Sequence, residues 1–372
     1  MSNKVLIIGM GEVGRIILEF LARDPKCPEL VMGDINEERG QFLTNTAIAQ
    51  AAAARLYPSI TFKKIDLTEV DNTADFIKEI TPDVVINSSV MQTWSEVRKL
   101  PKDLYEKISS ATLGAWIPCQ LALPYKLMLS IKKTGLNPHV INTSLPDFVN
   151  QILAKVGLAP TIGIGNVENI NNGVKIIVSR KLQVPMDIIK IFLICHHVWW
   201  VYPREAGIKR GIPFYIKVIV NNKDVTEQFD TEQLLWDSIK LYPPGTEFTT
   251  VAASSAILNM YALLSPSGIF THSPSPKGLP GGYPIILSNK GPELALPEGI
   301  KIEEAIEINK KSEKFDGVER IEEDGTVVYM DYTHKILSSM LGFTRKSFNV
   351  QESFEVAKEL IAKYKAFAAK YI

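Results

Sequence analysis

The fold is decided by the stretch Lys4-Val5-Leu6-Ile7-Ile8-Gly9-Met10-Gly11-Glu12-Val13-Gly14-Arg15-Ile16-Ile17-Leu18. Its apolar start predicts a strand, and the residues after the last glycine predict a helix. In this G-x-G-x-x-G spacing Gly9 permits a tight turn, Gly11 lets the backbone approach a pyrophosphate, and Gly14 lets the helix pack on the strand. Because a helix N-terminus offers free N–H groups to an anion, the stretch predicts a dinucleotide site.

A second apolar run, Leu30-Val31-Met32-Gly33-Asp34, ends in a carboxylate about 20 residues after the glycine loop. An acidic side chain at this distance binds the ribose 2′-hydroxyl and repels a 2′-phosphate, so we expect NAD rather than NADP. The cofactor contacts predicted around the loop are Gly9, Gly11, Glu12, Val13, Gly14, Asp34 and Ile35.

Length and charge limit the kind of protein. The 372 residues exceed the roughly 250 to 300 at which single cores stop growing, so two domains are expected. The 41 basic and 41 acidic residues cancel, which favours a small-molecule substrate over nucleic acid or a membrane surface. The three cysteines show no paired or metal-ligand spacing, and no signal sequence or long apolar span is evident, so a cytoplasmic location is expected.

Strand and helix patterns alternate in the first part of the chain. We expect helices at residues 36–56, 72–80 and 103–134, the last kinked near Pro118 and Pro124, and strands at residues 60–66, 83–87 and 139–143. The pattern predicts an α/β fold, with a Rossmann-type doubly wound parallel sheet over residues 1–157. Ligands of such sheets lie at the carboxyl ends of strands, so the cleft should also contain Asn87, Ser88, Ser89, Thr143 and Ser144.

The pattern changes after residue 157. An α+β catalytic domain is expected over residues 158–372, with a C-terminal helical extension. Helices are predicted at residues 166–182, 231–241, 249–264 and 350–371, and strands at residues 188–195, 214–221, 282–287 and 325–329. Glycine, proline and serine dominate residues 265–282, which predicts an irregular loop there.

Several short motifs, in order, resemble the lactate/malate dehydrogenase superfamily over most of residues 1–312. The glycine loop and Gly33-Asp34-Ile35-Asn36-Glu37-Glu38-Arg39 are similar to its cofactor loop and D-I-x-x-x-R segment. The loop that contains Arg98 is similar to its mobile substrate loop. Further matches to the family's S-N-P-x-D, V-I-G-x-G and catalytic-histidine motifs are Ser144-Leu145-Pro146-Asp147, Ile162-Gly163-Ile164-Gly165 and Leu193-Ile194-Cys195-His196-His197.

Two charges of the family are missing. There a histidine takes the substrate's hydroxyl proton, an aspartate orients it, and an arginine grips the substrate carboxylate. Carried over from Gly165, the aspartate falls on Asn169 and the arginine on Asn172. Glu168 replaces the aspartate if the match shifts by one residue, and Arg98 or Arg180 remains for the arginine. The resemblance therefore implies a substrate other than plain lactate or malate.

The histidine itself is open between two neighbours. Counting from Pro185 and Asp187 selects His196, whereas aligning the apolar strand selects His197. Because side chains alternate along a strand, one of the two should face the cleft. For the same reason Cys195 and the two histidines make a poor chelate, so no metal site is expected.

The resemblance implies an NAD-dependent dehydrogenase that passes a hydride to or from a small hydroxy or keto substrate and forms a homo-oligomer, a dimer or tetramer. His196 or His197 would move the proton, Glu168 or Asn169 would orient it, and Arg98 would hold the substrate. A family 4 glycosidase remains an alternative on His197-Val198-Trp199-Trp200. So do a saccharopine-reductase-like or sugar-modifying enzyme, on Asp66-Leu67-Thr68, and a dinucleotide-binding protein without catalysis.

Overall fold

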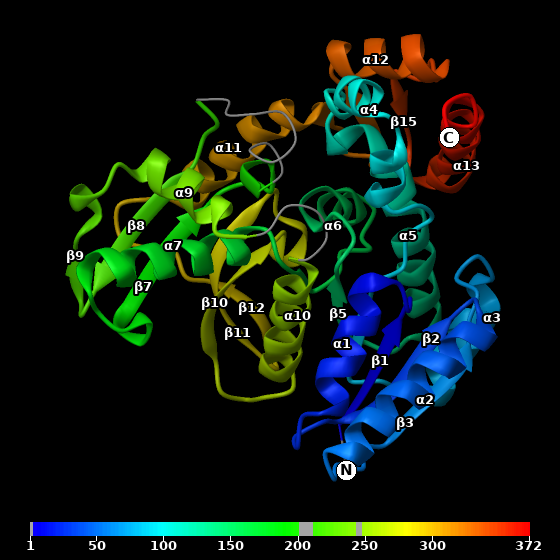
Figure 1. Cartoon of the computed structure of the whole chain (residues 1–372), viewed down its shortest axis with the longest axis horizontal. Coiled ribbons are helices and arrows are strands. Elements are labelled where there is room, and N and C mark those ends of the chain that lie inside the picture. The colour runs from blue at the N-terminus through cyan, green and yellow to red at the C-terminus, as the bar shows by residue number, and fades with distance from the viewer. Residues whose placement is uncertain (1–2, 201–210, 243–247) are drawn as a thin grey trace.

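The computed structural model describes residues 3–200, 211–242 and 248–372 (Figure 1). The first part of the chain forms a six-stranded parallel sheet in the order β3-β2-β1-β4-β5-β6, which confirms the predicted Rossmann-type topology. Its strands are β1 (Lys4–Ile8), β2 (Glu29–Asp34), β3 (Ile60–Lys64), β4 (Val84–Asn87), β5 (His139–Asn142) and β6 (Ile162–Gly163). The strand order reverses between β1 and β4, and ligands bind at such a switch point.

Helices cover both faces of this sheet because its buried strands are apolar on both sides. Leu6, Ile8 and Val85 belong to one core, with α3 (Val70–Ile80), α5 (Ile117–Thr134) and α6 (Pro146–Lys155). Val5, Ile7 and Ile86 belong to the other, with α1 (Glu12–Ala22), α2 (Glu37–Ala53) and α10 (Thr249–Leu263). Since α10 comes from the second part of the chain, it joins the two parts (Figure 1).

The second part is built on antiparallel sheets, as an α+β domain. One sheet contains β7 (Ile189–Ile194), β8 (Tyr215–Val220) and β9 (Lys223–Asp224); another contains β10 (Ile269–Pro274), β11 (Gly282–Ser288) and β12 (Gly291–Leu294). The helices here are α7 (Val167–Leu182), α9 (Thr231–Lys240) and α11 (Ile302–Glu313), with 3-10 turns η3 (Met186–Ile188), η4 (Thr226–Gln228) and η5 (Pro276–Gly278). Residues of α7, α9 and β7 share one core.

Residues 313–372, called here the C-terminal segment, return to the first part of the chain. The segment consists of η6 (Lys314–Asp316), β13 (Val318–Ile321), β14 (Val327–Tyr329), α12 (Asp331–Leu341), β15 (Ser347–Phe348), η7 (Val350–Glu352) and α13 (Ser353–Ala368). Figure 1 shows α13 beside α5 and α12 beside α4 (Lys102–Ser109). The domain boundary after residue 157 stays a prediction, since β6 extends the first sheet beyond it.

Two predictions about elements are wrong. The single helix expected over residues 103–134 is broken into α4, η2 (Leu113–Trp116) and α5, because Thr112 has a φ of 68° and Pro118 lies in the first turn of a new helix. The loop expected over residues 265–282 contains β10, which pairs with β11 along its whole length. Thr271, His272 and Ser273 of β10 are polar but buried, so the polar composition of this stretch wrongly indicated a loop where a core strand lies.

Candidate active site

A cleft of about 720 Å³ lies at the carboxyl ends of the parallel strands. Most of the predicted cofactor contacts line it, namely Gly9, Gly11, Glu12, Val13, Asp34, Ile35, Ser88, Ser89, Thr143 and Ser144. Gly14 and Asn87 lie behind this lining. The cleft also receives His197, Asn169 and Arg98, so one space holds the glycine loop and three of the five candidate catalytic residues.

The three glycines of the loop are each required for a different reason. Gly9 has a φ of +94°, and a Cβ there would lie 2.6 Å from the backbone of Ser89. A Cβ on Gly14 would lie 1.9 Å from the carbonyl oxygen of Gly9, so α1 packs directly on the loop. At Gly11 nothing lies within 4 Å, which leaves the open space that a pyrophosphate needs beside the helix N-terminus.

Asp34 both shapes the loop and faces the cleft. Its Oδ2 accepts a hydrogen bond from the Met10 N–H at 2.6 Å, and its Oδ1 accepts one from the Asn36 N–H at 2.9 Å. A carboxylate has about four acceptor sites, so both oxygens retain capacity for ribose hydroxyls. The residues present therefore fit a dinucleotide.

Asn87 is engaged by the protein. The side chain is buried, its Nδ2 donates to Asn142 Oδ1 at 3.0 Å, and its Oδ1 accepts from Ser89 Oγ at 2.6 Å. These bonds tie the ends of β4 and β5 together. The structure thus places Asn87 behind the cleft, where it positions Ser89, and direct contact with a cofactor stays a prediction for Ser88 and Ser89.

The two histidines lie just beyond β7, which ends at Ile194. Their ring centroids are 4.3 Å apart, and each ring also meets the edge or face of Phe148. The alternation expected of a strand does not apply here, because the chain has left the strand. Of the pair, His197 lines the cleft and His196 lies behind it.

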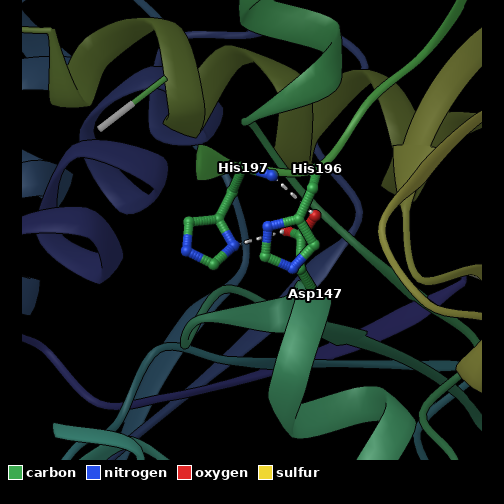
Figure 2. Close-up of side chains that lie close together, drawn as sticks. All are labelled: Asp147, His196 and His197. Carbon is green, nitrogen blue, oxygen red and sulfur yellow. Dashed lines mark hydrogen bonds and ion pairs between the residues drawn. The ribbon is translucent and has the colours of Figure 1, made fainter. Parts of the chain in front are cut away.

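Two carboxylates flank the ring of His197. Its Nε2 lies 2.7 Å from Asp316 Oδ2, and its Nδ1 lies 3.7 Å from Asp147 Oδ2. The His197 backbone N–H also donates to Asp147 Oδ1 at 3.1 Å, as Figure 2 shows. All three side chains are buried. Burial opposes a charge on the imidazole, but Asp316 and then Asp147 outweigh it and raise the pKa of His197.

The neighbouring groups respond differently. Burial lowers the pKa of His196 well below its ordinary value, and the charge of His197 lowers it further, so His196 is neutral. Burial raises the pKa of Asp147, although His197 and an N–H bond from Asn166 at 2.5 Å oppose this. Since His197 has the raised pKa and also lines the cleft, it is the stronger candidate for proton transfer.

The same cluster has the spacing of a metal site. One ligand atom from each of Asp147, His196 and His197 lies within 4.8 Å of the others, so the predicted divergence of the histidines is wrong. The contacts nevertheless favour a proton. Both nitrogens of His197 face carboxylate oxygens, and both oxygens of Asp147 already accept N–H groups. An imidazolium is attracted to both carboxylates, with its Nε2–H donating to Asp316, whereas a metal ion held by Asp147 would compete with the N–H groups that this carboxylate accepts.

The hydrogen bonds that the structure shows for the side chains of Glu168 and Asn169 do not include a histidine. Glu168 is buried and accepts a hydrogen bond from Ser255 Oγ, and the Ser255 oxygen also accepts the Gly165 N–H at 3.2 Å. Asn169 lines the cleft, and its buried Oδ1 has no hydrogen-bond partner. In the described part of the chain, the carboxylates that reach His197 come from Asp147 and Asp316, so the orienting role expected of Glu168 or Asn169 stays a prediction that these contacts do not support.

Sequence reasoning missed Asp316 and the aromatic lining of the cleft. Asp147 belongs to the stretch Ser144-Leu145-Pro146-Asp147, which resembles the S-N-P-x-D motif, but no role was predicted for its side chain. Asp316 lies in the C-terminal segment, 119 residues from its histidine, and carries no local signal. The unanticipated lining side chains are Trp94, Trp116, Phe248 and Phe354, and Trp200 of the motif His197-Val198-Trp199-Trp200 lines the cleft with them.

Burial of Glu168 leads to a testable effect of pH on stability. Burial raises the pKa of this carboxyl to about 7, so folding stabilises its protonated form. Its contribution is complete below the unfolded pKa near 4.5 and is lost as the pH rises through about 7. At pH 8 we expect the free energy of unfolding of Glu168→Gln, measured by urea titration, to exceed that of the native protein by up to about 3 kcal/mol. At pH 4 we expect no such gain. The exposed Glu303→Gln is the control, and an equal difference at both pH values would contradict the burial argument.

The glycine loop, the strand order and the cleft together define an α/β fold of the Rossmann type. No protein-family model matches the chain, and no curated protein matches its sequence. Solved structures match its fold. Lactate dehydrogenase from Cryptosporidium parvum, complexed with lactic acid and β-nicotinamide adenine dinucleotide, has a TM-score of 0.59 at 16% identity, covering 85% of this chain and 98% of that one.

Two further solved structures also match the fold of this chain. Lactate dehydrogenase from Eimeria maxima, with NADH and oxamate, has a TM-score of 0.58 at 14% identity and covers 84% of this chain and 92% of that one. Malate dehydrogenase from Cryptosporidium parvum has a TM-score of 0.57 at 15% identity and covers 85% of this chain and 97% of that one. The resemblance to this superfamily is therefore shown at the level of the fold. Among the described residues, no helix is long and apolar enough to cross a membrane.

Proposed function

We propose that the protein is an NAD-dependent oxidoreductase that transfers a hydride to or from a small hydroxy or keto substrate. The observation that carries this proposal is that His197 and the glycine loop line the same cleft. NAD, when bound, supplies the hydride carrier. The residues that would hold it are the glycine loop, Asp34 and Ser88-Ser89. The NAD-containing dehydrogenases with this fold support the choice of cofactor.

His197 would move the proton that accompanies the hydride. Asp316 engages Nε2, so Nδ1 is the nitrogen that exchanges a proton with the substrate oxygen. In the reduction direction the imidazolium donates a proton, and in the oxidation direction the neutral ring accepts one. Asp147 lies beside Nδ1 and would stabilise the charged ring in both directions.

The substrate is proposed to differ from lactate and malate. Asn172, where the resemblance places an arginine, is not among the residues that line the cleft. Among the described lining residues the permanently cationic side chains are Arg39, in α2, and Arg98, in η1 (Trp94–Lys99). Arg98 would therefore polarise the substrate oxygen or hold an anionic group. Asn169 Oδ1, buried without a partner, would accept a hydrogen bond from the substrate.

Turnover with a defined panel tests the proposal. Purified protein is titrated with NADH by fluorescence and then assayed with 2-keto acids, neutral ketones, amino acids, alcohols and glycosides, with and without Mn²⁺. We expect NADH binding and oxidation with a hydroxy or keto compound. Tight NADH binding without turnover on the whole panel would overturn the enzyme assignment, and glycoside cleavage that needs Mn²⁺ would favour the glycosidase alternative. Light scattering tests the proposed homo-oligomer.

The choice of NAD over NADP rests on Asp34. Asp34→Asn keeps the side chain's shape and an acceptor oxygen but removes the charge that repels a 2′-phosphate. We expect the ratio of the Kd for NADPH to the Kd for NADH to fall by about 10-fold. The reason is that the repulsion between the Asp34 carboxylate and the 2′-phosphate, about 1.4 kcal/mol, is lost. The measurement is fluorescence titration with both cofactors, and Asp24→Asn is a control remote from the glycine loop. An unchanged ratio would remove the carboxylate from cofactor selection.

A further inference from the structure

Asp316 joins two parts of the cleft wall. Its side chain is buried, and its Oδ2 lies 2.7 Å from Nε2 of His197. Its Oδ1 accepts a hydrogen bond from the backbone N–H of Leu113 at 3.1 Å. Leu113 begins η2 and itself lines the cleft. One carboxylate thus fixes the histidine and the wall beside it.

Two glycines let the chain bring this carboxylate so close. A Cβ on Gly114 would lie 2.0 Å from the backbone oxygen of Asp316. Gly317 has a φ of +84°, and a Cβ there would lie 2.4 Å from Thr333 Oγ1 and 2.6 Å from Thr112 Oγ1. Since no larger residue fits at either position without a shift of the chain, the approach of Asp316 is a packed feature of the fold.

The rest of the C-terminal segment holds the same wall. Thr333 Oγ1 donates to the Ala111 carbonyl at 3.2 Å, and Tyr364 Oη donates to the Glu96 carbonyl at 2.7 Å. Trp116 packs edge to face on Tyr364, with ring centroids 5.6 Å apart, and Trp94 packs on Trp116 at 5.9 Å. Both tryptophans line the cleft. The segment therefore fixes the loop after β4 from outside while Asp316 reaches through to the histidine.

We propose that Asp316 is a positioning residue of the active site, and that the C-terminal segment supplies the carboxylate which the helix at Glu168 and Asn169 does not. Asp316 holds the proton of neutral His197 on Nε2 and leaves Nδ1 to the substrate. The catalytic role of Asp316 rests on the proposed function. The tautomer and charge that Asp316 imposes on His197 do not depend on that function and can be measured without turnover.

The groups that face His197 set the expected sign. Among the residues that the structure describes, they are Asp316 from η6, Asp147 from α6, and the neutral ring of His196. An opposite charge favours the imidazolium, so replacement of Asp316 by a neutral residue lowers the pKa of His197. In the reduction direction the rate falls as the imidazolium loses its proton, and that fall moves to lower pH in Asp316→Asn.

The test compares Asp316→Asn with native protein. The amide oxygen can still accept the Leu113 N–H, while the charge is lost. We expect kcat for hydride transfer to fall by about 10²-fold, the pH midpoint to fall by about 1 unit, and the Kd for NADH to stay within about 2-fold. The control is Asp331→Asn, an exposed carboxylate of the same segment paired with Lys346. Unchanged kcat and midpoint in Asp316→Asn would overturn the inference.

A second measurement needs neither the variant nor turnover. Histidine ¹⁵N spectra of the native protein report which ring nitrogen carries the proton, with His197 assigned by the loss of its signals in His197→Gln. We expect the Nε2–H tautomer when the ring is neutral, and a pKa above the ordinary 6.5. An Nδ1–H tautomer, or a pKa below 6.5, would overturn the inference. Failure of the substrate panel with this tautomer present would instead overturn the proposed function alone.

Discussion

His197→Gln is expected to lower the rate of hydride transfer by about 10³-fold and to leave the Kd for NADH within about 2-fold of the native value. Glutamine cannot exchange a proton near neutral pH, so the transition state loses its acid or base, while the glycine loop and Asp34 remain intact. The measurement is kcat by NADH absorbance together with fluorescence titration of the cofactor. A parallel loss of NADH affinity would assign the ring to cofactor binding instead.

His196→Gln is the matched control. Both rings contact Phe148 and both are buried, but His196 lies behind the cleft lining. We expect His196→Gln to retain most of the native activity when rates are compared at equal concentrations of folded protein. If His196→Gln were inactive and His197→Gln active, the assignment would be reversed.

Incubation with EDTA should leave the native rate unchanged, and loss of activity that Mn²⁺ restores would show that the cluster with Asp147 holds a metal.

The fold was predictable because its signals are local. The buried strands β1 and β4 are short apolar runs, and the glycine spacing fixes the turn that follows β1. Asp34 ends β2 at the distance that a ribose contact requires. Each of these features depends on neighbours within one β-α unit, so the periodicity of side chains is sufficient to indicate it.

The partner of the histidine was not predictable for the opposite reason. The contact between His197 and Asp316 spans 119 residues and depends on where the C-terminal segment crosses η2. A resemblance that ends near residue 312 carries no information about that crossing. The contact of Glu168 was not predictable for a related reason. Its position next to Asn169 matched a motif, but its side chain turns toward Ser255 on α10.

The histidine pair shows how an element boundary changes chemistry. Side-chain alternation would separate His196 from His197 if both lay on the strand. Because β7 ends at Ile194, the backbone turns and the two rings come within 4.3 Å of each other. A sequence pattern does not fix the end of a strand to the residue, and here the exact end decides whether the rings are neighbours.

Gly14→Ala is expected to destabilise the protein by about 3 kcal/mol and to weaken NADH binding by at least about 10-fold. The added methyl would lie 1.9 Å from the Gly9 carbonyl oxygen and 2.5 Å from Ser88 Oγ. The first of these atoms is backbone, so α1 has to move away from the loop, and the N–H groups at its start move with it. Urea unfolding and NADH titration measure the two effects.

Gly11→Ala separates packing from ligand space. Nothing lies within 4 Å of a Cβ at Gly11, so this variant should unfold at the native urea concentration. The methyl would project into the space that we assign to the pyrophosphate, and NADH binding should weaken by about 10-fold or more without loss of stability. Native affinity in Gly11→Ala would mean that the phosphates lie elsewhere in the cleft. The two glycines, three residues apart, thus report separately on the helix that carries the loop and on the ligand that the loop is proposed to hold.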